Sequence, residues 1–109
     1  MLTHTVLFWA DDDLTSAQLA DFEAGLRTLL SIPSVRQGWV GTASATNRKV
    51  VDRSYTFALL LRFDDLAAHD AYQVHPIHDA FHSRCVKYWK KVVVYDFDDL
   101  PGTAVPASR

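Results

Sequence analysis

The sequence has few of the features that mark specialised protein classes. It has one cysteine among 109 residues, Cys85, so an internal disulfide is impossible. Four glycines and four prolines are too few for a collagen-like or low-complexity chain. Eleven Lys and Arg against thirteen Asp and Glu give a net charge of -2. This balance provides no electrostatic attraction for nucleic acid or an anionic membrane, and we expect neither partner.

Long apolar runs are also missing. No stretch approaches the ~18 residues of a membrane span, and the first apolar run, residues 6–10, is too short for a signal peptide. We therefore expect a cytoplasmic protein. The chain is 49% hydrophobic and 22% charged, as in ordinary globular proteins. Its length fits one domain, which we assign to residues 1–98, followed by a flexible tail at residues 99–109.

The residue patterns predict a β-α-β-β-α-β order of elements. Runs of β-branched and aromatic residues predict strands at 3–9, 35–45, 55–63 and 92–97. A capping-box pattern at Thr15 begins a helix expected to end near Ser31. Asp64 or Asp65 caps a short helix through Tyr72, and after Pro76 a further helix carries His78, Phe81, Cys85 and Tyr88. This order predicts an α+β, ferredoxin-like fold, with a four-stranded antiparallel sheet and helices on one face.

Both faces of the predicted sheet are apolar. In the first strand, His4, Val6 and Phe8 share one face, and Thr5, Leu7 and Trp9 share the other. Helices can cover only one of these faces, and a soluble monomer rarely exposes a large apolar patch. We therefore predict a homodimer that packs sheet against sheet about a two-fold axis. The alternative is a monomer whose tail folds over the open face.

Four of the five histidines lie between residues 69 and 82. His78 shares a predicted helix face with Phe81 and Cys85, and Tyr72 precedes it across the proline break. If His4 faces the helices, it could converge with Tyr72 and His78 in one apolar pocket, which is typical of a small-molecule site. The alternative is structural: His78 and Tyr72 hydrogen-bond each other or the backbone, and His4 is a core histidine.

We expect neither a metal nor a cofactor. His75, His78 and His82 have helical spacings of three and four that can place two ligands together. However, Pro76 interrupts the first pair, and no third ligand is evident. His69 and His82 are interpreted as surface residues, and Cys85 as a buried structural thiol. The chain has no glycine-rich phosphate loop and no cysteine-rich metal signature.

Several stretches of the chain resemble the stress-responsive dimeric α/β-barrel family, called Dabb. They are His-Thr-Val-Leu-Phe at 4–8, Tyr-Thr-Phe-Ala-Leu-Leu-Leu-Arg-Phe at 55–63, Ala-Tyr-Gln-Val-His-Pro-Ile-His at 71–78 and Val-Val-Val-Tyr-Asp-Phe at 92–97. The resemblance covers about residues 2–97. It implies a ferredoxin-like protomer and a homodimer whose two sheets form a dimeric α/β barrel. The family includes boiling-stable plant stress proteins, a plant polyketide cyclase and many bacterial proteins of unassigned activity.

The resemblance also implies roles for particular residues. By similarity to the cyclase, the acid/base histidine falls on His78, its tyrosine partner on Tyr72, and a pocket histidine on His4. Four further residues are expected to contact the substrate: Phe22, Leu26, Phe57 and Phe81. Phe57 stands where the cyclase has another pocket histidine and Leu26 where it has an aromatic residue, so we do not transfer the cyclase's substrate.

The expected function is therefore that of a cofactor-independent small-molecule enzyme or binder. It would use His/Tyr acid–base chemistry on a hydrophobic, carbonyl-containing ligand, as in a cyclase, lyase or isomerase. The alternative is a non-catalytic dimeric stress or interaction protein. A cofactor-free monooxygenase is a third possibility, based on analogy of fold alone.

Overall fold

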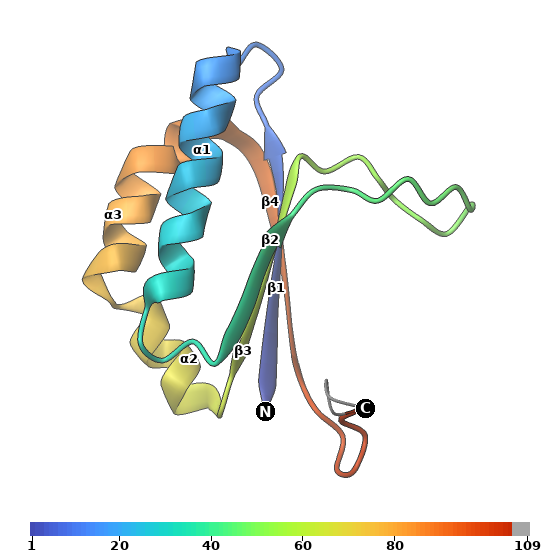
Figure 1. Ribbon diagram of the computed structural model, residues 1–109, viewed down its shortest axis with the longest axis vertical. Helices are drawn as coiled ribbons and strands as arrows, with labels where there is room; N and C mark the ends of the chain where they lie inside the picture. Colours follow the sequence, from blue (N-terminus) through green and yellow to red (C-terminus); the bar gives the residue numbers. More distant parts are fainter. Residues whose placement is uncertain (106–109) are drawn as a thin grey trace.

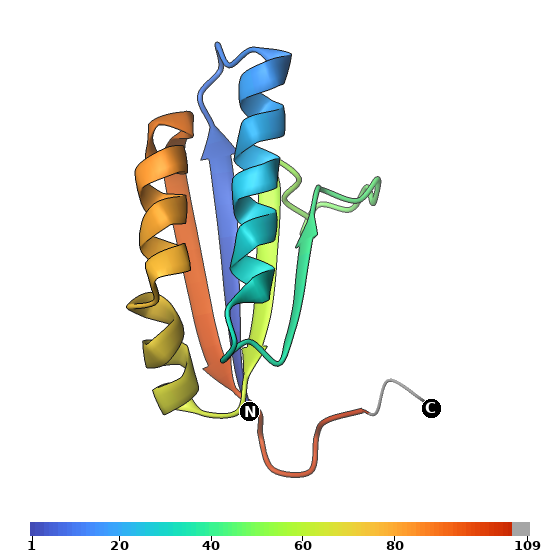
Figure 2. The same cartoon turned by 60° about the vertical axis from the view of Figure 1, so that its left-hand side comes forward.

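In the computed structural model, which describes residues 1–105, four antiparallel strands form one sheet in the order β2-β3-β1-β4. The strands are β1 (Leu2–Ala10), β2 (Gln37–Gly41), β3 (Phe57–Phe63) and β4 (Trp89–Asp98). The helices α1 (Ser16–Thr28), α2 (Leu66–Gln73) and α3 (Pro76–Cys85) all cover the same face (Figures 1 and 2). The predicted ferredoxin-like α+β fold is confirmed. No helix within residues 1–105 is long and apolar enough to cross a membrane.

The alternation of residues along the strands decides which side chains form the core. On β1, His4, Val6 and Phe8 face the helices and are at most 5% exposed. They lie opposite Leu61, Leu59 and Phe57 of β3 in the antiparallel register. The helices complete this core with fully buried side chains, which are Phe22, Leu26 and Tyr72. The apolar surface removed from water on this face is the main source of the fold's stability.

Side-chain caps fix where the helices begin. The Thr15 hydroxyl accepts a hydrogen bond from the Gln18 backbone N–H at 3.1 Å, and the Gln18 amide oxygen accepts one from the Thr15 N–H at 2.8 Å. Asp65 accepts a bond from the Ala68 N–H at 2.9 Å and so begins α2. His75 caps α3 through its Nδ1, which accepts a bond from the Ile77 N–H at 3.1 Å. These caps satisfy N–H groups that have no partner in the first helical turn.

The structure corrects the predicted strand boundaries. β2 spans five residues rather than 35–45, because it is an edge strand whose neighbour β3 begins only at Phe57. β3 itself begins two residues later than predicted. β4 begins at Trp89 rather than residue 92, because a register shift between Trp9 and Ala10 allows Ala10 to pair with Trp89. Local sequence patterns do not report such a shift, which depends on the neighbouring strand.

The predicted helix ends were too late by one turn. α1 ends at Thr28, and the 3-10 turn η1 (Leu29–Ser31) fills the span predicted as helix. α3 ends at Cys85, and a second 3-10 turn, η2 (Val86–Tyr88), follows it. Tightening of the last turn in this way is common at the ends of α-helices.

The other face of the sheet carries no helix. Its side chains include Trp39, Tyr95 and Phe97, which are 55%, 62% and 56% exposed. Leu60 of β3 and Val93 of β4 lie on the same face and are half-buried. The loop at residues 42–56 extends away from the sheet on this same side (Figure 1). We refer to this surface as the open sheet face.

The chain after β4 is anchored at its start. The Arg62 guanidinium donates to both carboxylate oxygens of Asp99, at 2.7 and 3.1 Å, and the Asp99 N–H donates to the Met1 carbonyl at 3.0 Å. Gly102 then adopts a φ of +75° after Pro101 in a turn closed by a bond from the Thr103 N–H to the Leu100 carbonyl. Residues 106–109 of the predicted tail lie outside the described residues.

A first prediction concerns the contact between α1 and α3. A Cβ added to Gly25 would lie 2.4 Å from the buried Cys85 sulfur, so the helices must separate to admit it. We expect Gly25→Ala to lower the free energy of unfolding by about 1–3 kcal/mol, despite the better helix propensity of alanine. In the Cys85→Ala background, Gly25→Ala should lower the free energy of unfolding by less than it does in the wild type, because the sulfur that the new Cβ would meet is absent. Urea unfolding measures all four proteins, and an unchanged stability of Gly25→Ala would contradict the contact.

Candidate functional site

A pocket of about 150 Å³ lies between α2, α3 and the half of the sheet formed by β1 and β4. Its polar wall contains His4, Tyr72, Gln73, His78 and His82. Its apolar wall contains Val6, Phe8, Leu29, Leu59, Phe81, Trp89, Val92 and Val94. Val92 and Val94 remain 41% and 48% exposed, which shows that the helices do not fully cover β4. The pocket therefore opens to solvent along this edge strand.

Tyr72 lies between the two histidines that the sequence placed with it. Its ring centroid is 5.7 Å from that of His4 and 5.0 Å from that of His78, in both cases edge to face. Burial raises the pKa of the Tyr72 phenol well above its ordinary value. The phenol therefore stays protonated at neutral pH and is available as a hydrogen-bond donor.

One form of the structural alternative was a hydrogen bond between Tyr72 and His78. Their rings meet edge to face, and within residues 1–105 no hydrogen bond joins the Tyr72 hydroxyl to His78. The helix break is instead held by His75, whose Nδ1 caps α3. The polar atoms of Tyr72 and His78 thus remain available to a ligand in the pocket.

The surroundings of His78 favour its neutral form. Partial burial is the largest effect and lowers the pKa of the imidazole. The neighbouring Asp79 raises this pKa, whereas His82, His4 and His69 lower it further. Near neutral pH, His78 therefore has an unprotonated nitrogen that can accept a proton.

His4 contacts Asp96, which in turn lies near His69, and the sequence analysis missed both of these neighbours. Its Nδ1 lies 2.5 Å from Asp96 Oδ1, across the β1–β4 pair in which the two residues are opposite each other. The second oxygen of Asp96 lies 3.9 Å from His69 Nε2. Burial lowers the pKa of His4 more than Asp96 raises it. His69 was interpreted as a surface residue, but its side chain is only 13% exposed.

Only part of the expected substrate wall lies at the pocket. Phe81 lines it, together with His4, Tyr72 and His78. Phe22 and Leu26 are fully buried in the core under α1 and do not reach the pocket. Phe57 lines a different surface hollow, beside Val40 and Glu23. The wall residues from β4 were missing from the prediction, although the alternation of Val92, Val94 and Asp96 could have placed them opposite His4.

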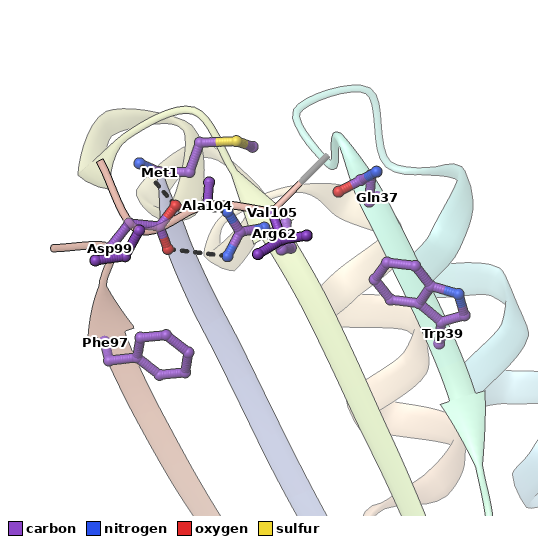
Figure 3. Close-up of a pocket in the computed structure, with 9 residues that line it drawn as sticks. Met1, Gln37, Trp39, Arg62, Phe97, Asp99, Ala104 and Val105 are labelled. Atoms are coloured by element: carbon purple, nitrogen blue, oxygen red, sulfur yellow. Dashed lines mark hydrogen bonds and ion pairs between the residues drawn. The ribbon is translucent and has the colours of Figure 1, made fainter. Parts of the chain in front are cut away.

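A larger hollow, of about 590 Å³, lies on the open sheet face (Figure 3). Trp39 and Phe97 flank it, and Arg62 and Asp99 provide its charge. These two charges are paired with each other, and Asp99 lies 3.8 Å from the Met1 amino group. The hollow therefore presents charges that are paired with each other, whereas the smaller pocket presents the Tyr72 hydroxyl and the His78 imidazole in an apolar wall. The smaller pocket is therefore the candidate functional site.

Comparison with known families gives one match that covers nearly the whole chain. The family described as Stress responsive A/B Barrel Domain, or Dabb, matches residues 2–99. This span contains every strand and helix of the structure and all the residues of the pocket.

The individual proteins that resemble this chain have low sequence identity to it. The olivetolic acid cyclase of Cannabis sativa is 23% identical over 95 residues, which cover 86% of this chain and 92% of the cyclase. A dimeric ferredoxin-like protein of unknown function from Thermobifida fusca has a TM-score of 0.73 at 25% identity, with 88% of each chain covered. The hydroxynitrile lyase from Passiflora edulis has a TM-score of 0.74 at 20% identity, with 96% of each chain covered.

A second prediction follows from the burial of the two pocket histidines. We expect both His4 and His78 to titrate below about 6.5, the ordinary pKa of a histidine side chain. Because the unfolded chain then binds protons more tightly, these groups should lose their stabilising contribution as the pH falls below about 6.5. NMR titration of the imidazole signals measures these pKa values, and the spectrum of His78→Gln identifies the His78 signal by its absence. A pKa at or above 6.5 for His78 would contradict the prediction.

Proposed function

The chain belongs to the stress-responsive A/B barrel domain family, and from this premise we propose that it is a cofactor-independent enzyme that acts on a small, hydrophobic carbonyl compound. The observation that carries the proposal is the pairing of Tyr72 and His78, whose rings meet at 5.0 Å in the wall of an apolar pocket. One group is a phenol held in its protonated form, and the other is an imidazole held in its neutral form.

These two states match the needs of proton abstraction next to a carbonyl. His78 takes the proton from the carbon, and the electron pair of the broken C–H bond moves onto the carbonyl oxygen as an enolate. The Tyr72 hydroxyl donates a hydrogen bond to that oxygen and stabilises its developing charge. The enolate then adds to a second carbonyl, eliminates a group or is reprotonated, as in cyclase, lyase or isomerase chemistry. Positioned acid–base catalysis of this kind accelerates a reaction by about 10²- to 10⁴-fold.

The size of the pocket restricts the reacting part of the substrate. An apolar cavity of about 150 Å³ accommodates a molecule the size of benzene. A longer substrate would extend past the exposed Val92 and Val94, where the pocket opens. The wall is apolar except for its histidines, Tyr72 and Gln73, so the ligand class is an uncharged aromatic or aliphatic carbonyl compound.

Two of the similar proteins are named for reactions of a compatible kind. One is a cyclase and the other a hydroxynitrile lyase. Their different names support acid–base chemistry on this scaffold without pointing to one substrate, since function depends on the site rather than on the fold. The loss of aromatic and histidine groups at Leu26 and Phe57 also argues against transfer of the cyclase's substrate.

The functional unit in this proposal is a homodimer joined through the open sheet face. The observation behind it is the row of exposed apolar side chains there, among them Trp39, Tyr95 and Phe97. A solved protein with this fold is described as dimeric. A second copy would bury this surface and leave the pocket accessible, because the pocket lies on the opposite face of the sheet.

A third prediction tests the acid–base pair with phenylacetaldehyde, which combines a benzene-sized ring with an activated C–H next to a carbonyl. The wild type should accelerate exchange of the α-hydrogens with solvent deuterium, measured by NMR. His78→Gln should lose about 10²-fold or more of this acceleration, and Tyr72→Phe should lose about 10-fold or more. His75→Asn is the matched control, because His75 lies outside the pocket and asparagine retains the helix cap.

Two results of this experiment would contradict the proposed chemistry. One is a wild-type rate equal to that of His78→Gln. The other is an equal loss in His78→Gln and His75→Asn, which would point to a general disturbance of α3 rather than to a base. Circular dichroism of each variant confirms that the compared proteins are folded.

A fourth prediction tests the homodimer. The wild type should sediment at twice the 12.3 kDa of the chain. Val93→Asp places a charge on the open sheet face, opposite Leu7 of β1, and should produce monomers, because a buried unpaired carboxylate is strongly unfavourable. Ala24→Asp, at an exposed position of α1, is the matched control and should remain dimeric. A monomeric wild type, or a dimer that tolerates Val93→Asp, would contradict this assignment of the interface.

A further inference from the structure

We propose that His4, His69 and Asp96 form a binding site for a divalent transition-metal ion of the zinc class, where α2 meets the sheet. Each residue offers one nitrogen or oxygen ligand atom, and these atoms all lie within 4.8 Å of one another. The three residues come from three different elements, which are β1, α2 and β4. None of them has the role of acid or base in the proposed reaction.

The geometry requires little rearrangement to hold an ion. A tetrahedral zinc ion with ligands at about 2.1 Å separates its ligand atoms by about 3.4 Å. Asp96 Oδ1 lies 2.5 Å from His4 Nδ1, and Asp96 Oδ2 lies 3.9 Å from His69 Nε2. Because the three ligand atoms all lie within 4.8 Å of one another, no pair must change its separation by more than about 1.4 Å. The backbone supports this arrangement, since His4 and Asp96 are direct partners in the β1–β4 register.

The contact of His69 Nδ1 with Asp70 leaves Nε2 as the ligand atom of this histidine. Nδ1 lies 3.2 Å from the Asp70 carboxylate, which is the partner that fixes the tautomer of many metal-ligating histidines. With the proton on Nδ1, Nε2 carries a lone pair and lies 3.9 Å from the Asp96 oxygen, so two electron-rich atoms are close to each other. The Gln73 side-chain nitrogen, 3.4 Å from Nε2, is the competing partner within the protein. A cation between His69 and Asp96 resolves this repulsion better than a long amide contact.

His4 can join as the third ligand without a change in charge. Burial keeps it neutral, and a shift of its proton from Nδ1 to Nε2 leaves a lone pair toward the ion. The ligand set is then two imidazoles and one carboxylate, which favours zinc, cobalt or nickel over the oxygen-seeking magnesium and calcium ions. Asp96 is 41% exposed at its side chain, so an ion can enter from solvent and keep a water in its fourth position.

Such an ion would connect α2 to two strands of the sheet. α2 also carries Tyr72, so metal binding would tighten one wall of the pocket while leaving His78, which is not a ligand, free to act. The inferred role is therefore structural and separate from the proposed chemistry. The site lies on the helix-covered face and would stay accessible in a dimer formed through the open sheet face.

The test is calorimetric titration of the EDTA-treated, buffer-exchanged full chain with zinc chloride, together with thermal unfolding at increasing zinc concentration. We expect one ion per chain and a rise in the melting temperature with zinc. His69→Gln and Asp96→Asn should each weaken binding by about 10-fold or more. His82→Gln removes another histidine of the same region and is the matched control, with unchanged affinity. Both ligand variants avoid the buried His4, whose replacement could prevent folding.

Three outcomes would overturn the site. These are the absence of binding by the wild type, wild-type zinc affinity in His69→Gln and Asp96→Asn, and a loss of affinity in His82→Gln as large as in the two ligand variants. The visible spectrum of cobalt added in place of zinc gives an independent measure, since tetrahedral coordination should produce intense absorption that His69→Gln lacks. Because His78→Gln should retain full zinc binding, failure of the proposed reaction and failure of the metal site are distinguishable.

Discussion

Three short helices must cover one apolar face of a four-stranded sheet, and the site depends on where this cover is incomplete. Over the centre of the sheet the cover is tight, as Leu59 and Leu61 of β3 are at most 1% exposed. At the β4 edge, Val92 and Val94 are on the helix-facing side yet remain partly exposed. Because α2 and α3 are separate helices that meet at Pro76, they leave a hollow beneath their junction. The polar side chains at this junction consequently line a pocket.

The same apolar surroundings set the protonation states of the groups in the pocket. A charge is costly where water is excluded, so burial disfavours the imidazolium forms of His4 and His78 and the phenolate of Tyr72. The result is a neutral base beside a neutral donor at physiological pH. Asp96 contacts His4 Nδ1 and raises the pKa of this histidine, but by less than burial lowers it. The exclusion of water by the helices therefore both stabilises the core and sets the protonation states of the groups in the pocket.

The sequence was sufficient for features that depend on local pattern. Alternation along the strand at residues 3–9 placed His4 on one face with Val6 and Phe8, and Pro76 identified the break between Tyr72 and His78. It was insufficient where partners lie far apart in the chain. The pairing of His4 with Asp96 depends on the β1–β4 register, which includes a shift at Trp9 and Ala10. The expectation that Phe22 and Leu26 contact the substrate came from the resemblance, and helical periodicity could add only that both residues lie on a buried face, without identifying what they pack against.

The strand β4 couples the two surfaces on which the proposed function depends. Its even-numbered residues, Val92, Val94 and Asp96, point toward the pocket and the two histidines His4 and His69. Its odd-numbered residues, Val93, Tyr95 and Phe97, lie on the open sheet face. An edge strand on its own has unpaired backbone groups on one side and is among the more mobile parts of a sheet. Burial of its odd-numbered side chains against a second copy would restrict this motion and hold the even-numbered side chains in place. Dimerisation would then contribute to the precision of a site that it does not touch, which gives a physical reason for the two apolar faces to occur in one short chain.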